Sequence, residues 1–455
     1  MPDKNQLYYG DNLEVLRDYI KDESVDLVYL DPPFNSRADY SLLFKEKDGT
    51  QSTSQMTAFE DTWEWNIDSE HAYQEVVEGG GRVAEAMRAF RTFLGNSDMM
   101  AYLSMMAPRL MELRRVLKPT GSIYLHCDPT ASHYLKILMD GIFGPQFFRS
   151  EVIWKRTSAH SGSKRWGPVH DVILFWSKAD SYVWNNVFQA YSDKYLDDFY
   201  RFTDDGGRYR IGDLTGAGTR TGESGQAWRD VDPTDSGRHW AVPNKTVVKL
   251  FGDVSARWTV QQKLDALDEA GLISWPKKGK IPGFKRYLNE DAGVSIVDVI
   301  TDIDPIAAQS AERLGYPTQK PEALLERIIK ASSNEGDVVL DPFCGCGTAV
   351  VAAQTLNRRW IGIDVTHLAI GLIKQRLFDK FGESVKGTYE IHGEPTDLAG
   401  ARKLAEDDKF QFEAWALSLL GARLKEGRIE EWKSPGIPQT AQSQKLETCC
   451  YQRHR

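Results

Sequence analysis

The segment VYLDPPFNS at residues 28–36 brings together residue types that could do chemistry. An apolar strand is expected to end at Asp31, and the two prolines that follow fix the backbone of the turn. Phe34 and Asn35 come directly after them. A carboxylate and an aromatic ring on a stiff strand exit are suited to meeting a ligand, although prolines are also common in ordinary turns.

A second segment, DVVLDPFCGCGTAVVAAQ at residues 337–354, has the pattern of a cofactor turn. A strand is expected to run into Asp341, the chain turns through Gly345 and Gly347, and a helix follows. Glycines let main chain approach a ligand closely, and a helix N-terminus offers unpaired N–H groups to an anionic part of it. Asp364 ends the next expected strand, where a carboxylate can accept hydrogen bonds from ribose hydroxyls. The spacing indicates an adenosine-containing cofactor, and tight packing of the turn is the alternative.

The composition and the remaining patterns disfavour several classes of protein. The glycine pattern differs from the G-x-G-x-x-G of dinucleotide enzymes, and no G-x-x-x-x-G-K-S/T phosphate loop occurs. No run approaches the roughly 18 consecutive apolar residues of a membrane helix, and the N-terminus lacks a signal-peptide pattern. We therefore expect a cytoplasmic protein, without a membrane partner. The five cysteines have no zinc-site spacing beside a histidine cluster, so we expect free thiols and no metal.

Taken together, DPPF and DPFCGCGT make the chain resemble the amino-methyltransferases of DNA over most of residues 7–380. The resemblance implies S-adenosylmethionine as the cofactor. YPTQKPEALLERII, directly upstream of the glycine turn, is similar to the family segment that completes the cofactor pocket. The cofactor-binding residues implied in this way are Asp11, Thr318, Lys320, Pro321, Asp341, Pro342, Phe343, Gly345, Gly347, Thr348 and Asp364.

The same resemblance assigns DPPF to the catalytic loop, which acts on a base swung out of the duplex. Asp31 and the carbonyl of Pro32 would accept hydrogens from the exocyclic amino group, so that its nitrogen can attack the methyl group in line. Pro33 helps to fix the loop, and Phe34 would stack on the extruded base, which contributes roughly 1–3 kcal/mol. Asp in the first position of the loop favours adenine N6 over cytosine N4 within the family. His126 is expected to be structural.

These residues require an α/β fold to position them. Helices and strands are expected to alternate at both ends of the chain, which predicts a doubly wound, mostly parallel sheet with helices on both faces. The resemblance implies a seven-stranded, Rossmann-like methyltransferase sheet. The catalytic loop precedes the cofactor loop, an order that resembles the circularly permuted beta group of the family, in which an irregular region between the loops recognises the DNA target.

Four segments follow from this organisation. Residues 1–180 would form the catalytic half of the methyltransferase domain, with an insertion at 39–95 that could cover the site. Residues 181–305 would form the inserted, irregular target-recognition region, and 306–386 the cofactor-binding half. Residues 387–455 would be a linker and a C-terminal extension that looks like the truncated entry to a fused restriction nuclease, without cleavage activity.

Basic residues interleaved with tryptophans in the central region suit a nucleic-acid groove, although charge runs are usually solvated faces. The net charge of -9 argues against indiscriminate coating of nucleic acid. Double-stranded DNA is therefore the expected partner, in a prokaryotic or phage, nucleoid-associated setting, and a restriction-system partner and a homodimer stay open. The DNA-binding residues proposed from the sequence are Asn35, Lys155, Arg156, Lys164, Arg165, Lys277 and Lys278.

The leading prediction is an adenine N6 methyltransferase acting on duplex DNA. The alternatives are a cytosine N4 methyltransferase, and a DNA-binding restriction-modification fragment without transfer activity. The first hypothesis depends on the carboxylate corner at Asp31 and the glycine turn at Gly345 folding into adjoining pockets.

Overall fold

The computed structural model describes residues 4–33, 40–41, 57–59, 64–158, 164, 166–277, 281–288, 293–307, 309–316, 318–420, 422–425 and 428–431. The chain divides into two compact units. The larger unit is Met1–Val187 with Val297–Arg455, and the smaller is Phe188–Ile296. The smaller unit lies inside the segment 181–305 that the sequence sets apart.

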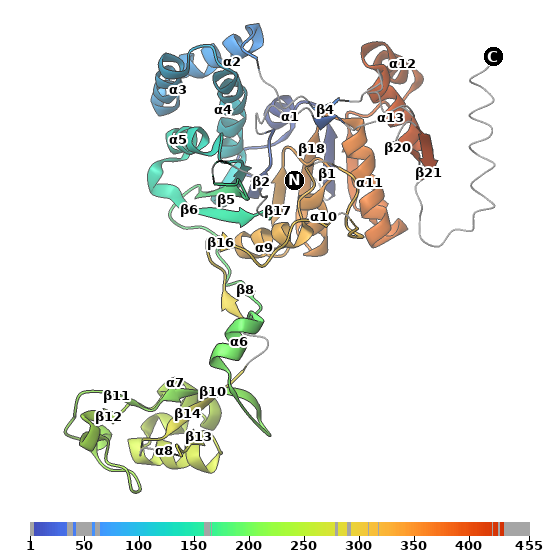
Figure 1. Cartoon of the computed structure of the whole chain (residues 1–455). Coiled ribbons are helices and arrows are strands. Elements are labelled where there is room, and N and C mark those ends of the chain that lie inside the picture. The colour runs from blue at the N-terminus through green and yellow to red at the C-terminus, as the bar shows by residue number, and fades with distance from the viewer. Residues whose placement is uncertain are drawn as a thin grey trace, which may run out of the picture. The chain divides into compact units, whose positions relative to one another are not determined.

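The larger unit is built on one sheet that has nine strands among the described residues, in the order β16-β6-β7-β5-β2-β17-β18-β1-β19 (Figure 1). Its strands are β1 (Asn5–Tyr9), β2 (Val25–Leu30), β5 (Leu117–Cys127), β6 (Phe148–Lys155), β7 (His170–Ser177), β16 (Val299–Ile300), β17 (Val338–Asp341), β18 (Arg359–Asp364) and β19 (Tyr389–His392). All of them run parallel except β7, which is antiparallel to β5 and β6.

The mostly parallel sheet was predicted correctly, but the predicted number of seven strands is wrong. The two additional strands are β16 and β19, which lie at the two edges. They are short and fall in segments that the sequence assigned to the recognition region and the linker, so no apolar run marked them.

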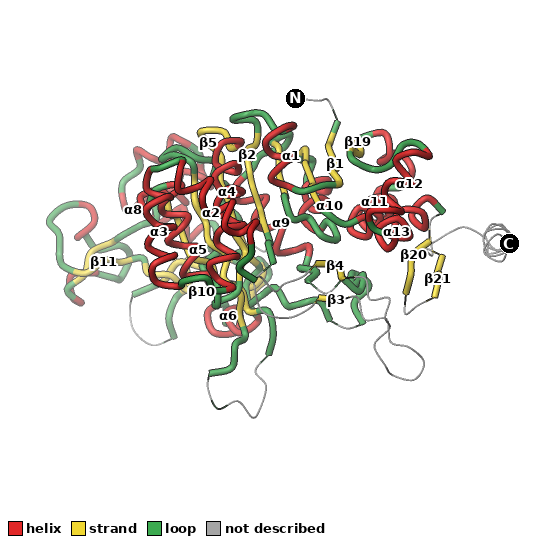
Figure 2. The backbone as a smooth tube through the Cα atoms, turned by 90° about the horizontal axis from the view of Figure 1, so that it is seen from above, coloured by secondary structure: helices red, strands yellow, loops and turns green. Residues whose placement is uncertain are grey.

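Helices cover both faces of the sheet. They are α1 (Asn12–Tyr19), α2 (Ile67–Glu78), α3 (Gly81–Leu94), α4 (Asp98–Val116), α5 (Ser132–Phe143), α9 (Glu322–Ser332), α10 (Thr348–Thr355) and α11 (His367–Phe381). The side chains of β2 alternate between the two layers, as strand geometry requires. Val28 and Leu30 share a buried cluster with α1, α4 and α5, whereas Leu27 and Tyr29 share one with α9, α10 and α11. Figure 2 shows α2, α3 and α4 packed side by side, in the region predicted as an insertion and just after it.

The order of strands brings the beginning of the chain beside its end. β2 pairs in parallel with β17, with Leu27 opposite Val339 and Val28 opposite Leu340. The carboxyl ends of parallel neighbours meet at one edge of a sheet, where ligands bind in open α/β folds. Asp31 and Asp341 are therefore delivered to the same edge.

The rest of the larger unit consists of short or peripheral elements. They are β3 (Tyr40–Ser41), β4 (Thr57–Phe59), α12 (Leu398–Asp407), α13 (Lys409–Leu419), β20 (Ala422–Lys425) and β21 (Arg428–Glu431). α13 packs on α11, and the backbone N–H of His367 donates to Gln411 Oε1 at 2.8 Å. The predicted nuclease remnant stays a prediction, and residues 432–455 lie outside the described ranges.

The smaller unit has its own core. A four-stranded sheet is formed by β9 (Phe202–Asp204), β10 (Gly207–Asp213), β13 (Ile273–Ser274) and β14 (Gly283–Tyr287). The other elements are β8 (Phe188–Gln189), α6 (Asp193–Phe199), β11 (Thr215–Ala217), β12 (Arg238–Trp240), α7 (Asn244–Phe251), α8 (Val260–Glu269) and β15 (Val294–Ser295). Trp228, Trp240 and Leu264 are buried together. The sequence predicted an irregular region here and indicated none of these elements, because helices and strands this short leave no persistent period in the sequence.

Within the described residues, no helix has both the length and the apolar character needed to cross a membrane.

Candidate active site

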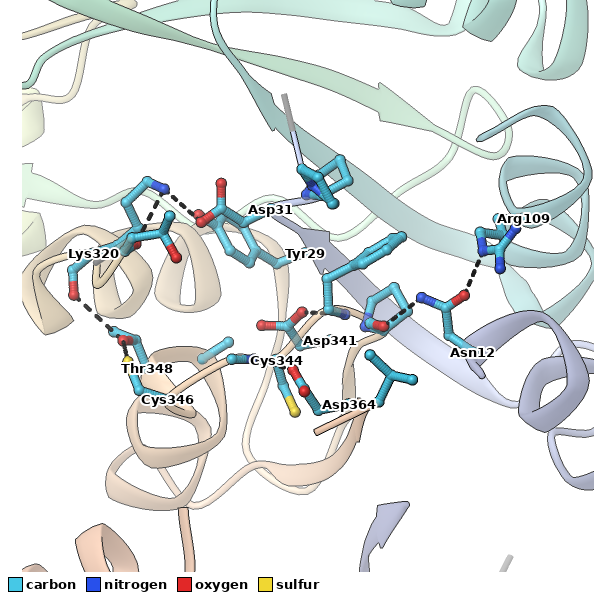
Figure 3. A pocket seen from close by; sticks show the side chains of 18 of the residues that line it. Asn12, Tyr29, Asp31, Arg109, Lys320, Asp341, Cys344, Cys346, Thr348 and Asp364 are labelled. Carbon is cyan, nitrogen blue, oxygen red and sulfur yellow. Dashed lines mark hydrogen bonds and ion pairs between the residues drawn. The ribbon is translucent and has the colours of Figure 1, made fainter. Parts of the chain in front are cut away.

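A cavity of about 940 Å³ lies at the carboxyl ends of β2, β17, β18 and β1 (Figure 3). It brings together most of the residues proposed from the sequence. Those that line it are Asp11, Asp31, Pro32, Pro33, Thr318, Lys320, Asp341, Pro342, Phe343, Gly345, Thr348 and Asp364. The carboxylate corner and the glycine turn thus share one cavity.

Three of the proposed catalytic and cofactor-binding residues are placed differently or not described. Pro321 caps the N-terminus of α9, and Gly347 caps that of α10, and neither lines the cavity. Phe34 lies outside the described residues, so its stacking role stays a prediction.

The Asp31 carboxylate forms an ion pair with Lys320. Its Oδ2 accepts a hydrogen bond from Lys320 Nζ at 2.5 Å, and both side chains are largely buried. Its Oδ1 is buried and has no hydrogen-bond partner among the described residues. A buried polar atom without a partner is costly, and in native structures it commonly marks a place where a ligand or water binds. Asp31 therefore keeps one acceptor for a ligand.

The turn after β17 depends on two glycines with left-handed backbone. Gly345 has φ of 49° and Gly347 has φ of 76°. A Cβ at Gly347 would lie 2.6 Å from Ile373 Cγ1, and one at Gly345 would lie 3.1 Å from the ring of Tyr316. Glycine is required at 347 for both conformation and space. Arg376 supports the turn by donating from Nη1 to Thr348 Oγ1 at 3.1 Å.

Two acids line the cavity beside the glycine turn, the buried Asp341 and the partly buried Asp364. Asp364 accepts from the backbone N–H of Gly345 at 2.9 Å through Oδ2, and from Thr366 through Oδ1. Burial raises its pKa to about 6, against the opposing effect of these hydrogen bonds. Burial also raises the pKa of Asp341 well above its ordinary value. Each oxygen of a carboxylate accepts more than one hydrogen bond, so Asp364 can tie the turn to β18 and still receive ribose hydroxyls.

Two residues that the sequence did not single out connect the walls of the cavity. Asn12 Nδ2 donates to the carbonyl of Pro342 at 2.7 Å. Arg109, on α4, donates from Nε to Asn12 Oδ1 at 2.6 Å and from Nη2 to Asp11 Oδ2 at 2.5 Å. The first turn of α1 is thereby tied to the turn after β17. Asn12 stands next to Asp11 in the sequence, but nothing in the helical period distinguishes Arg109 from a solvated residue.

The cysteines of the glycine turn are not activated for chemistry. Cys344 and Cys346 are free and buried, and burial raises the pKa of both thiols. A thiol needs a lowered pKa to act as a nucleophile at neutral pH. Their side chains line the cavity as small residues of the turn.

The proposed DNA-binding residues are only partly described. Lys155 is exposed at the end of β6, and Arg156 pairs through Nε with Asp171 Oδ1 at 3.1 Å. Lys164 and Lys277 are exposed, in different units. Asn35, Arg165 and Lys278 lie outside the described residues. The contacts of this set with DNA stay predictions.

Comparison with known proteins assigns the chain to a family. The N6/N4 methyltransferase family model, described as DNA methylase, matches residues 25–375, which include both loops of the cavity. The chain belongs to this DNA methylase family. It is a DNA methyltransferase, and the predicted resemblance to the amino-methyltransferases of DNA is confirmed at that level.

Individual relatives of this DNA methylase include a type II methyltransferase and a subunit of a type III restriction-modification enzyme. It is 29% identical over 387 residues to the type II methyltransferase M.EcaI of Enterobacter cloacae, a match that covers 85% of this chain and 71% of the relative. It is 28% identical over 370 residues to the StyLTI Mod subunit, a type III restriction-modification enzyme of Salmonella typhimurium, covering 78% of this chain and 50% of that subunit. The chain therefore spans half the length of this second relative.

The similarity to solved structures is low. The M1.HpyAVI–SAM complex is 15% identical, covers 82% of this chain and 98% of the other, and has a TM-score of 0.35. The family assignment does not depend on it.

Proposed function

We propose that this protein transfers a methyl group from S-adenosylmethionine to the exocyclic N6 amino group of adenine in duplex DNA. The observation that carries the proposal is the buried, unpartnered Oδ1 of Asp31 in the same cavity as the glycine turn of Gly345. Asp31 Oδ1 can accept a hydrogen bond from an amino group, and the glycine turn can bind an adenosine cofactor. Direct transfer of a methyl group requires both ligands in the same cavity.

The residues around the glycine turn fit the cofactor. Gly345 has no side chain and lines the cavity, so main chain can approach a ligand there. The backbone N–H groups at the start of α10 and the N-terminal end of its dipole suit the methionine carboxylate, and Asp364 suits the ribose. When bound, S-adenosylmethionine supplies an electrophilic methyl group.

Asp31 and Pro32 prepare the amino nitrogen. In a free base the lone pair of this nitrogen is delocalised into the ring. Hydrogen bonds to Asp31 Oδ1 and the Pro32 carbonyl favour a pyramidal nitrogen whose lone pair points at the methyl group. Lys320 holds Oδ2 and Pro33 stiffens the loop, so the acceptors are preorganised before the reaction. The base must leave the stack to reach them, and Phe34 is proposed to stack on it.

Adenine is proposed over cytosine because Asp stands at the first position of the loop, a preference within the family. Cytosine N4 presents a similar amino group, so the product must be measured. The chain is expressed in a bacterial host that lacks DNA methyltransferases, and its DNA is digested to nucleosides and analysed by mass spectrometry. We expect N6-methyladenine with the wild type and none with Asp31→Ala. Detection of N4-methylcytosine would show that cytosine, not adenine, is the substrate. DNA that stays unmodified although the host contains well-folded protein would reject the transfer activity.

Target recognition is proposed for the smaller unit, residues 188–296, with Lys277 among its DNA contacts. Arg and Lys side chains read guanine edges in the major groove, and phosphate contacts fix the register. By analogy with the Mod subunit, a partner from a restriction system is also proposed. Co-purification from a host that also expresses the restriction subunit of a type III system would test that association.

A further inference from the structure

A chain of polar side chains crosses the buried face of the sheet and starts at the cavity. Tyr29 Oη lies 2.9 Å from His126 Nδ1, and His126 Nε2 lies 3.2 Å from Asp171 Oδ2. Arg156 then pairs with the other oxygen of Asp171. The strands β2, β5 and β7 that carry the first three residues are neighbours. The inner three side chains are at most 2% exposed, whereas that of Arg156 is 42% exposed.

This row of polar side chains is unusual because it lies in apolar surroundings. Leu27, Ile173 and Phe175 face the same side of the sheet in an apolar cluster. A carboxylate and an imidazole buried there lose hydration, and apolar residues of similar volume are often no less stable than a buried ionic pair. Stability of the core therefore does not explain why a histidine and an aspartate occupy positions 126 and 171.

The inner end of the chain faces the reacting groups. Tyr29 and Asp31 are two residues apart at the end of one strand, so their side chains leave the sheet on the same face. Both line the cavity. Burial raises the pKa of Tyr29 well above its ordinary value, which keeps the phenol protonated.

The protonation pattern of the chain follows from its partners. Burial by itself raises the pKa of Asp171, but the hydrogen bond from His126 and the charges of Lys320 and Arg156 hold that pKa below its ordinary value. An ionised Asp171 only accepts, so His126 Nε2 carries hydrogen and donates to it. In the neutral ring Nδ1 is then an acceptor, and Tyr29 Oη donates to it.

We propose that Tyr29, His126 and Asp171 form a proton acceptor for the methyl transfer, an inference that rests on the proposed function. As the new N–C bond forms and the methyl C–S bond breaks, the amino nitrogen becomes cationic and carries one proton too many. That proton passes to Tyr29 Oη while the phenol proton passes to His126 Nδ1. The imidazolium is stabilised by Asp171, and the proton returns by the same route to water when the product leaves.

In this arrangement Tyr29 touches the base and is a catalytic residue, whereas His126 and Asp171 act through it. Charged groups from several neighbouring elements act on this row of side chains. Asp31 and Asp341 act on Tyr29, and Lys320 and Arg156 act on Asp171. A base must be free of the proton that it accepts, so the rate of a reaction that uses this acceptor should fall in acid.

The chain offers a matched control in Tyr124. It lies opposite Tyr29 on the neighbouring strand, it is also buried, and its hydroxyl is 2.6 Å from Ser332 Oγ. It does not line the cavity. Tyr29→Phe and Tyr124→Phe each remove one buried hydroxyl, but only the first removes the proposed acceptor.

The test is the single-turnover rate of labelled methyl transfer from S-adenosylmethionine to methylation-free bacterial genomic DNA, measured across pH for the full chain. General base catalysis contributes typically 10²–10⁴-fold, so we expect Tyr29→Phe and His126→Asn to lose about 100-fold. Cofactor affinity should change less than about twofold, and the acid limb of the profile should disappear in His126→Asn. Tyr124→Phe should keep the wild-type rate and profile.

Two results would overturn the proposal. Tyr29→Phe within about threefold of wild type, with an unchanged pH profile, would do so alone, and so would an equal loss in Tyr124→Phe. If His126→Asn fails to fold, the nearly isosteric Tyr29→Phe decides. A wild type that methylates nothing while binding the cofactor would reject the proposed function and this inference with it.

Discussion

At the scale of single residues, Lys320 compensates the charge of the largely buried Asp31 carboxylate. The two side chains are about 10% and 14% exposed, and they form an ion pair. Removing one member of a buried pair leaves the other charge uncompensated, which costs about 3–5 kcal/mol. Each charge therefore compensates the other, and Asp31 Oδ1 stays available for a ligand.

A substitution at Lys320 tests this pairing. Lys320→Met should lower the free energy of unfolding by about 3 kcal/mol, and Asp31→Asn in the same chain should restore most of it. Lys330 gives a matched control, because its pair with Glu326 is more exposed to solvent, and Lys330→Met should cost less than about 1 kcal/mol. The measurement is denaturant unfolding. Equal losses in Lys320→Met and Lys330→Met would contradict the buried pair.

Asp364 gives a prediction about pH. Its pKa in the folded chain is about 6 because it is buried, and its unfolded value is about 3.9. The folded state then holds the proton more tightly, so the contribution of Asp364 to the free energy of unfolding is greatest below about pH 4 and is lost as the pH rises through about 6. The loss amounts to about 3 kcal/mol.

Asp364→Asn removes this titration. The unfolding free energy of the variant, minus that of the wild type, should therefore rise by about 3 kcal/mol between pH 4 and 7. Other titrating groups cancel in that difference. A difference that stays flat with pH would mean that the carboxylate is not desolvated as the structure has it.

At the scale of elements, the turn between β17 and α10 is set by backbone that only glycine adopts easily. Gly347→Ala adds both conformational strain and a contact of 2.6 Å with Ile373 Cγ1. Gly336 has φ of 81° and open space around an added Cβ, so Gly336→Ala adds the strain alone, about 1–2 kcal/mol.

We expect Gly347→Ala to weaken S-adenosylmethionine binding at least about tenfold, because α11 and the turn must separate. Gly336→Ala should leave binding unchanged. Isothermal titration of both variants checks this. Wild-type affinity in a folded Gly347→Ala variant would show that the turn does not shape the cofactor site.

At the scale of the whole molecule, the two units have separate cores, and the ends of the smaller one are close together. Phe188 pairs with Ser295 in β8 and β15, so a short linker can replace the residues between them. We predict that a chain in which a Gly-Ser linker replaces 188–296 binds S-adenosylmethionine as the wild type does. It should lose methylation at specific sites by at least about 100-fold.

Titration with the cofactor and sequencing of modified positions in treated DNA measure these two properties. If the variant without residues 188–296 methylates the same sequences as well as the wild type does, the smaller unit does not recognise the target.

Several parts of this molecule could be predicted from the sequence because they depend on local rules. The strand into Asp31 and the strand, turn and helix around Gly345 carry apolar runs and glycines at fixed offsets, and both segments were found. Their meeting in one cavity required the pairing of β2 with β17, which follows from parallel-sheet topology.

Other parts depend on contacts that no local pattern contains. Arg109 reaches Asp11 and Asn12 across 97 or 98 positions of sequence, and its spacing in α4 is that of any helical residue. His126 was expected to be structural, since a lone histidine in a strand carries no signal, and its alignment with Tyr29 and Asp171 exists only in the folded sheet. The short elements of the smaller unit take their form from a shared tryptophan core rather than from periodicity.

The central claim is that the Asp31 corner and the glycine turn form one site for methyl transfer. The most direct test compares wild type and Asp31→Ala in cofactor affinity and in single-turnover transfer of labelled methyl groups to unmethylated duplex DNA. The account predicts similar affinity and at least about a 100-fold loss of transfer in the variant, the typical effect of removing a preorganised group. Near-normal transfer by a folded Asp31→Ala protein would contradict it.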